Sequence, residues 1–89
     1  MMDVTNNEAK SRYEMEVDGH TAFAAYVRQG DVWDFNHTVV PPELGGRGIG
    51  SKLVAGALAD VKAQGGKIIP TCSFVAGYVE KHPDAAEIA

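Results

Sequence analysis

The first half of the chain alternates polar and apolar residues in three successive runs. Tyr13, Met15 and Val17 alternate with charged residues, which is the period-two pattern of a strand with one buried face. Two further runs, 21–29 and 32–40, are rich in apolar, aromatic and β-branched residues, and short Asp/Gly turns separate the three. Turns of this length join neighbouring antiparallel strands. The pattern therefore predicts a three-stranded antiparallel meander.

The apolar spacing changes after Pro41-Pro42, where neither proline can donate a hydrogen bond to a sheet. The next apolar residues form one stripe of an amphipathic helix: Leu53, Val54, Ala57, Leu58 and Val61. Gly65-Gly66 is expected to end this helix. A short strand over residues 67–72 and a second helix over 73–81 follow, and His82-Pro83 ends the second helix.

The predicted order is therefore β-β-β-α-β-α, an α/β (α+β) fold. A strand, a helix and a second strand in succession imply a right-handed crossover with the two strands parallel. The fold is thus an antiparallel meander joined to a parallel strand pair by a crossover helix. Residues 1–10 are polar and are expected to be a flexible lead-in to a single domain of residues 11–89.

Charge and composition exclude several classes of partner. The formal net charge is −4 and the chain has no basic run, so neither nucleic acid nor a membrane surface is an expected partner. The chain has no apolar stretch of about 20 residues and no apolar leader. Its single cysteine, Cys72, excludes an internal disulfide and a multi-cysteine metal site. We therefore expect a cytoplasmic protein without a metal, either a monomer or a weak homodimer.

Four glycines occur within six residues, Gly45-Gly46-Arg47-Gly48-Ile49-Gly50, between the third predicted strand and the first helix. Such a turn lets the backbone approach an anion, and the helix that follows points free N–H groups at it. The alternative is a tight turn whose glycines only adopt left-handed conformations. A Walker A loop would need lysine directly after the final glycine, and the dinucleotide spacing Gly-x-Gly-x-x-Gly also fails.

The glycine run resembles the coenzyme-A pyrophosphate loop of the GNAT superfamily, Gln/Arg-x-x-Gly-x-Gly/Ala at the start of a helix. Gly48-Ile49-Gly50 matches the second half of that motif, whereas Gly45 stands where glutamine or arginine is usual. The stretch 36–84 is similar to small GNAT-like proteins predicted to be N-acetyltransferases. The shared features are His37-Thr38, Val40-Pro41, the glycine run, Pro70-x-Cys72-x-Phe74-Val75, Tyr78 and His82-Pro83.

This resemblance implies a reduced GNAT fold that binds acetyl-CoA as cosubstrate. Pantetheine would lie in a V between the strand before the glycine run and the strand after the helix, paired with the backbone of Thr38, Val39 and Val40. The pyrophosphate would lie on the loop and the first helical turn, formed by Gly45, Gly46, Arg47, Gly48, Ile49, Gly50 and Ser51. Arg47 would supply the charge that the motif's first position lacks here.

Three residues are candidates for the chemistry of acetyl transfer. Cys72 precedes the second helix, whose N-terminus lowers the pKa of a thiol, so it could accept the acetyl group; the alternative is a small buried residue. His37 is a candidate base, or a structural histidine. Tyr78 resembles, in its place along the chain, the tyrosine with which many GNAT enzymes protonate the leaving thiolate, and core packing is its alternative.

The sequence thus predicts a GNAT-like acetyltransferase that moves an acetyl group from acetyl-CoA to an unknown amine. The transfer would pass through S-acetyl-Cys72 or occur by direct attack of the amine. One alternative is a non-catalytic module or sensor that binds acetyl-CoA or coenzyme A, because the resemblance implies that the elements closing the acceptor pocket are missing. A further alternative is a structural domain whose glycine-rich turn binds no ligand.

Overall fold

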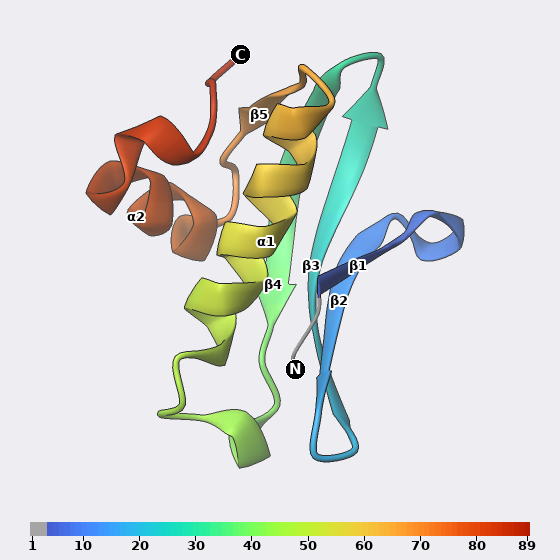
Figure 1. Cartoon of the computed structure of the whole chain (residues 1–89), viewed down its shortest axis with the longest axis vertical. Helices are drawn as coiled ribbons and strands as arrows, with labels where there is room; N and C mark the ends of the chain where they lie inside the picture. The colour runs from blue at the N-terminus through green and yellow to red at the C-terminus, as the bar shows by residue number, and fades with distance from the viewer. Residues whose placement is uncertain (1–3) are drawn as a thin grey trace.

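The computed structural model of the chain describes residues 4–89 and contains one five-stranded sheet with helix α1 lying across it (Figure 1). The helix α2 packs beside α1 and the outer part of the sheet. The strands are β1 (Val4–Asn7), β2 (Arg12–Val17), β3 (His20–Gln29), β4 (Val32–Val39) and β5 (Lys67–Ile69). The α-helices are α1 (Ile49–Ala63) and α2 (Ser73–Lys81), with 3-10 helices at Glu8–Lys10, Pro42–Leu44 and Pro83–Ala85.

The strands lie in the sheet in the same order as in the chain, β1-β2-β3-β4-β5. The first four pair antiparallel, and β5 pairs parallel with β4, with Trp33 opposite Ile68. Because α1 connects β4 to β5, the predicted crossover helix and α/β fold are confirmed. The strand β5 ends at Ile69, earlier than expected, since Pro70 has no N–H to continue the ladder.

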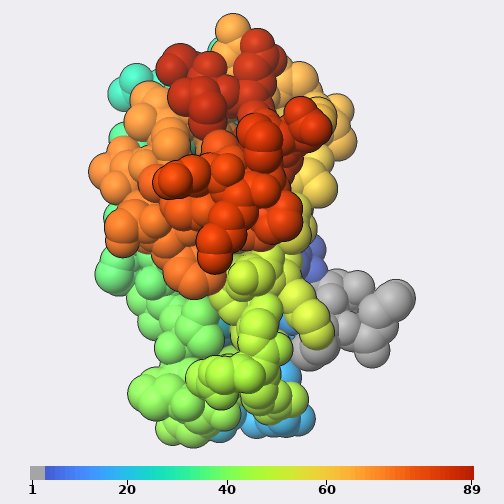
Figure 2. Space-filling view, turned by 90° about the vertical axis from the view of Figure 1, so that its left-hand side faces the viewer, coloured from blue at the N-terminus to red at the C-terminus, as the bar shows by residue number. Residues whose placement is uncertain are grey.

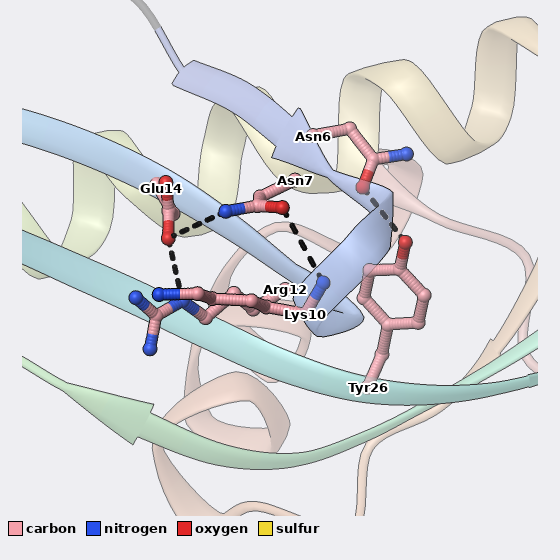
Figure 3. Close-up of polar contacts among 6 residues, drawn as sticks. All are labelled: Asn6, Asn7, Lys10, Arg12, Glu14 and Tyr26. Atoms are coloured by element: carbon pink, nitrogen blue, oxygen red, sulfur yellow. Dashed lines mark hydrogen bonds and ion pairs between the residues drawn. The ribbon is translucent and has the colours of Figure 1, made fainter.

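The polar start of the chain, expected to be a flexible lead-in, contains the edge strand β1, which the pattern of residues does not predict. This strand pairs antiparallel with β2. Its asparagines add side-chain hydrogen bonds (Figure 3): Asn7 Nδ2 donates to Glu14 Oε2 at 3.2 Å, and the Tyr26 hydroxyl donates to Asn6 Oδ1 at 2.7 Å. Residues 1–3 of the expected lead-in lie outside the described residues.

The core lies between one face of the sheet and α1. Trp33 is fully buried, and Tyr13 and Phe35 are 1% exposed. The helix contributes the apolar stripe expected from the sequence, and each of its members is at most 1% exposed: Leu53, Val54, Ala57, Leu58 and Val61. Burial of this stripe holds the start of α1, and with it the glycine-rich loop, against the sheet.

An irregularity in β4 changes which side chains face α1. Phe35 and His37 pair with the consecutive β3 residues Tyr26 and Ala25, so Asn36 is an extra residue in β4, a β-bulge. An inserted residue reverses the alternation of the side chains that follow it. Each β4 side chain after Asn36 therefore lies on the opposite face of the sheet from the one that simple alternation predicts.

Tyr13 ties the sheet to α1. Its hydroxyl donates a hydrogen bond to Asp60 Oδ2 at 2.6 Å, although its side chain is almost completely buried. Burial, and then the hydrogen bond to the Asp60 carboxylate, raise the pKa of the Tyr13 phenol far above its ordinary value.

We expect Tyr13 to make the domain sensitive to alkali. Because its pKa is raised on folding, its contribution is fully present below the pKa of an unfolded tyrosine, about 10, and is lost as the pH rises above it. Urea unfolding at about pH 8 and about pH 11 should show a larger loss of unfolding free energy in the wild type than in Tyr13→Phe. Equal losses in both proteins would show that Tyr13 ionises alike in the folded and unfolded chains.

Candidate functional site

The glycine-rich run connects the 3-10 helix Pro42–Leu44 to α1, and its glycines have local structural roles. Gly46 and Gly48 have φ angles of 76° and 69°, in the left-handed region that favours glycine. Gly50 leaves room for α2, since a Cβ added there would lie 2.7 Å from Phe74 Cζ. The number of glycines therefore does not by itself indicate a ligand.

The stronger indication of an anion site is the N-terminus of α1. Gly48 is its N-cap, and no side chain caps it. The N–H groups of Ile49, Gly50 and Ser51 have no acceptor within the helix, because the first helical bond runs from Lys52 N–H to Gly48 O at 3.2 Å. These groups border a hollow of about 240 Å³, lined by Val40, Leu44, Gly45, Gly46, Gly48, Ile49, Gly50, Ser51 and Phe74. An uncapped helix start beside a hollow suits a phosphate.

Arg47, the predicted source of positive charge, points toward another part of the molecule. Its Nη1 contacts Asp18 Oδ2, in the turn between β2 and β3, at 2.7 Å. The guanidinium remains half exposed, and Arg47 is not among the residues that line the hollow. The backbone of the loop, rather than this side chain, therefore borders the candidate anion site.

The strands β4 and β5 separate where the resemblance places pantetheine. Their last pair joins Asp34 and Ile69, and the next contact is from the Cys72 N–H to Phe35 O at 2.8 Å. Beyond this point no strand within residues 4–89 pairs along that edge of β4. This unpaired edge of β4 ends next to Val40, which lines the hollow at the glycine-rich loop.

Cys72 is the N-cap of α2 and lies at the point where the two strands separate. Its Sγ is 3.5 Å from Thr38 Oγ1, and its side chain is partly buried. Burial raises the pKa of the thiol, but the neighbouring Thr38 hydroxyl and the backbone N–H groups of Val75, Phe74 and Thr38 lower it more. The net pKa of Cys72 is therefore below that of an ordinary thiol, which favours the nucleophilic thiolate.

His37 and Thr38 lie on opposite faces of β4. Thr38 pairs with the buried Ala24 and so faces α1, whereas His37 is exposed and packs edge-on against Phe23, with ring centroids 6.4 Å apart. The structure gives no hydrogen bond between His37 and Cys72 among the described residues. The bulge at Asn36 turns the Thr38 side chain toward the Cys72 thiol. The sequence had indicated Thr38 only for its backbone.

Tyr78 lines a second hollow, and Cys72 is not among the residues that line it. The Tyr78 ring packs against that of His82, with centroids 4.5 Å apart and the ring planes tilted by 36°. The hollow measures about 310 Å³ and is lined by Ser51, Ser73, Phe74, Gly77, Tyr78, Lys81 and His82. Ser51 and Phe74 line both hollows, so the two adjoin at the start of α1. Figure 2 shows the atoms of α2, in orange, directly above the yellow-green start of α1 on this side of the molecule.

A family model described as GCN5-related N-acetyl-transferase matches residues 12–88. The chain belongs to this family. The resemblance noted in the sequence is thereby confirmed, and the match extends over all of β2 to α2. A search of curated proteins finds no match to the chain.

Membership of the GNAT family implies acetyl-CoA as the cosubstrate. Within residues 4–89, no three or more His, Cys, Asp and Glu side chains gather in a way that could hold a metal ion. None of the helices in this part of the GNAT chain is long and apolar enough to cross a membrane.

Proposed function

We propose that this GNAT domain binds acetyl-CoA and transfers its acetyl group to an amine. The observation that carries the proposal is the uncapped start of α1, which borders a hollow next to the unpaired edge of β4. The family match supports the same cosubstrate.

The pyrophosphate would accept hydrogen bonds from the N–H groups of Ile49, Gly50 and Ser51, at the positive end of the α1 dipole. From there the pantetheine arm would follow the unpaired edge of β4, residues 38–40, whose backbone groups can pair with its amides. The thioester would then lie near Cys72, where β4 and β5 separate. A single bound cosubstrate would thus extend from the glycine-rich loop to the Cys72 thiol.

The chemistry begins with the Cys72 thiolate, which attacks the thioester carbonyl of acetyl-CoA and forms a new carbon–sulfur bond. The bond to the coenzyme sulfur breaks, and coenzyme A leaves as a thiolate that takes a proton from solvent. A neutral amine then attacks S-acetyl-Cys72, forming the amide and releasing the Cys72 thiolate, while the amine nitrogen loses a proton to solvent. Direct attack of the amine on acetyl-CoA is the alternative route to the same products.

A second candidate function is binding without turnover. It is favoured by the positions of two candidate catalytic residues, because His37 lies on the open face of β4 and the Tyr78 ring packs against that of His82. A domain with a coenzyme site but no base beside the thiol would act as a sensor or carrier. An assay of coenzyme-A thiol release in the presence of amines separates the two functions, since only an enzyme releases more thiol than it has sites.

The variant Ser51→Glu tests the coenzyme site. Ser51 is exposed and is the third residue of α1, lining both hollows. A carboxylate there stabilises a helix by about 0.3–1 kcal/mol, but its negative charge lies at the same helix N-terminus and repels a pyrophosphate. We expect unchanged or raised thermal stability and an affinity for coenzyme A at least about tenfold lower, or about 1.4 kcal/mol.

Isothermal titration calorimetry with coenzyme A and acetyl-CoA measures this effect, and Ser51→Gln is the matched uncharged control. Ser51→Gln should keep most of the affinity because it adds the same bulk without the charge. If Ser51→Glu binds as tightly as the wild type, the pyrophosphate does not lie at the start of α1.

A further inference from the structure

The face of the sheet that points away from α1 is uncovered and partly apolar. A sheet face in water ordinarily carries polar side chains. Within residues 4–89 no side chain on this face is buried, and Val27 and Ile69 are 52% and 41% exposed. The register of the strands places further apolar side chains beside these two: Phe23, Ala25, Val32 and Val39. An apolar area of this kind on an open face indicates an interaction surface.

The side chains on this open face lie in rows across the strands. The rows, in order along β3, are Phe23 with Val39, Ala25 with His37, Val27 with Asp34, and Gln29 with Val32. The strand β5 extends the last two rows with Ile69 and Lys67. Asp34 and His37 share this face only because the bulge adds Asn36 between them, since residues three apart in a regular strand point to opposite faces.

The order of the rows is self-complementary. A two-fold axis that lies between two facing sheets, perpendicular to the strands and next to the bulge, would bring the first row of one copy over the last row of the other, and the second over the third. Val39 would then face Val32 of the second copy, and Ala25 would face Val27 of the second copy. The strand directions of the two sheets would lie within about 30° of each other, as facing sheets commonly do.

The same axis pairs the polar side chains of the open face. His37 of each copy would face Asp34 of the other, so the contact is made twice. Asp34 Oδ1 accepts a hydrogen bond from Thr71 Oγ1 at 2.6 Å, and the structure gives Oδ2 no partner within residues 4–89. The second oxygen can therefore accept a hydrogen bond from an imidazole N–H. The face thus matches itself in charge as well as in apolar contacts.

The size of the open face indicates how tightly two copies would associate. The rows extend over β2 to β5, and strands about 4.8 Å apart with rows about 6.7 Å apart give about 500 Å² on each copy, or about 1,000 Å² in total. Interfaces below about 1,200 Å² belong to weak complexes. We therefore expect a dissociation constant above about 1 µM, because interfaces of about 1,600 Å² already range from micromolar to picomolar.

We propose that two copies of this chain associate in solution through the faces of their sheets that point away from α1, with the two-fold axis next to the bulge in β4. Of the two states expected from the sequence, this is the weak homodimer. Because α1 lies across the opposite face (Figure 1), the start of α1 and its hollow remain accessible in the dimer. The inference does not depend on the proposed function.

Sedimentation equilibrium of the wild type from about 1 µM to about 1 mM tests the association, and the mean mass should rise with concentration from one chain toward two. Val27→Glu should remain monomeric over this range, because association would bury an unpaired carboxylate against Ala25 of the second copy. Val27→Thr is the matched control, since it keeps the branched shape without a charge, and it should still associate. Circular dichroism should show the same folded spectrum for all three proteins, because Val27 is half exposed.

A charge exchange tests the register of the two copies. His37→Asp should weaken association at least about tenfold, because carboxylates would then face each other at both contacts. Adding Asp34→His to His37→Asp should restore association relative to His37→Asp alone, because each imidazole again faces a carboxylate. The inference is overturned if the wild type stays monomeric at every concentration, if Val27→Glu associates as tightly as the wild type, or if the double variant associates no better than His37→Asp.

Discussion

Incubation with acetyl-CoA should add a single acetyl group to the protein at Cys72, and Cys72→Ala should lose this label completely. The thiol lies where β4 and β5 separate, and the Thr38 hydroxyl and the N–H groups at the start of α2 lower its pKa, which favours the thiolate. Intact-mass spectrometry measures the label, peptide mapping locates it, and hydroxylamine should remove it because the product is a thioester. A wild-type cysteine that stays unlabelled until the protein is denatured would leave only direct attack by the amine.

The variant Thr38→Val separates a reactive thiol from one that is merely accessible. Because the Thr38 hydroxyl lowers the pKa of Cys72, alkylation of the wild type should increase with pH through a pKa below that of a free thiol, about 8.5. In Thr38→Val the same curve should shift to higher pH while the folded structure, followed by circular dichroism, is retained. Identical curves in the two proteins would mean that Thr38 does not influence the thiol.

Gly66→Ala should be among the most destabilising single substitutions in this domain. Gly66 is buried after α1, and an added Cβ would lie 2.3 Å from Trp33 Cζ3 and 2.8 Å from Val61 Cγ1. Trp33 cannot easily move, because it is fully buried and the Arg28 guanidinium covers its ring at 4.0 Å. Overpacking of this kind costs about 2–3 kcal/mol, and we expect the melting temperature to fall by roughly 10–20 °C.

The neighbouring Gly65→Ala is the control for Gly66→Ala. Gly65 has a φ of 73° but open space around it, so alanine there should cost only the strain of a left-handed conformation, about 1–2 kcal/mol. Trp33→Phe removes the atoms that Gly66→Ala would touch, so the double variant should be more stable than the sum of the single effects predicts. Additive effects would show that the contact with Trp33 is not the cause.

Local periodicity predicts most of the fold. The strand pattern of the meander, the buried stripe of α1 and the bounds of α2 are visible in short windows of sequence. The strand β1 is not, because its asparagines gain partners that lie elsewhere in the chain, such as Tyr26 for Asn6. A polar segment that is stabilised by hydrogen bonds to distant residues is predicted to be a loop when only its own residues are considered.

The candidate site is less fully predictable, for two physical reasons. The position of Cys72 directly before a helix follows from spacing alone, but the face of β4 that meets the thiol depends on the bulge at Asn36, which has no clear signature. The second hollow depends on how α2 packs against α1. Gly77, Tyr78 and Lys81, which line this hollow, share one face of α2 by their spacing, but that spacing does not show that the face borders the start of α1.

The ion pair between Arg47 and Asp18 gives the Arg47 guanidinium an oxyanion partner within the molecule. The Asp18 carboxylate is already paired with the guanidinium in the folded protein, so the guanidinium is oriented before any ligand binds. An incoming diphosphate that recruited Arg47 would therefore exchange one oxyanion for another instead of immobilising a free side chain. Because Arg47 would exchange one anionic partner for another, its contribution to the binding affinity would depend only weakly on ionic strength. The fixed backbone dipoles at the start of α1 would then supply most of the selectivity for the coenzyme.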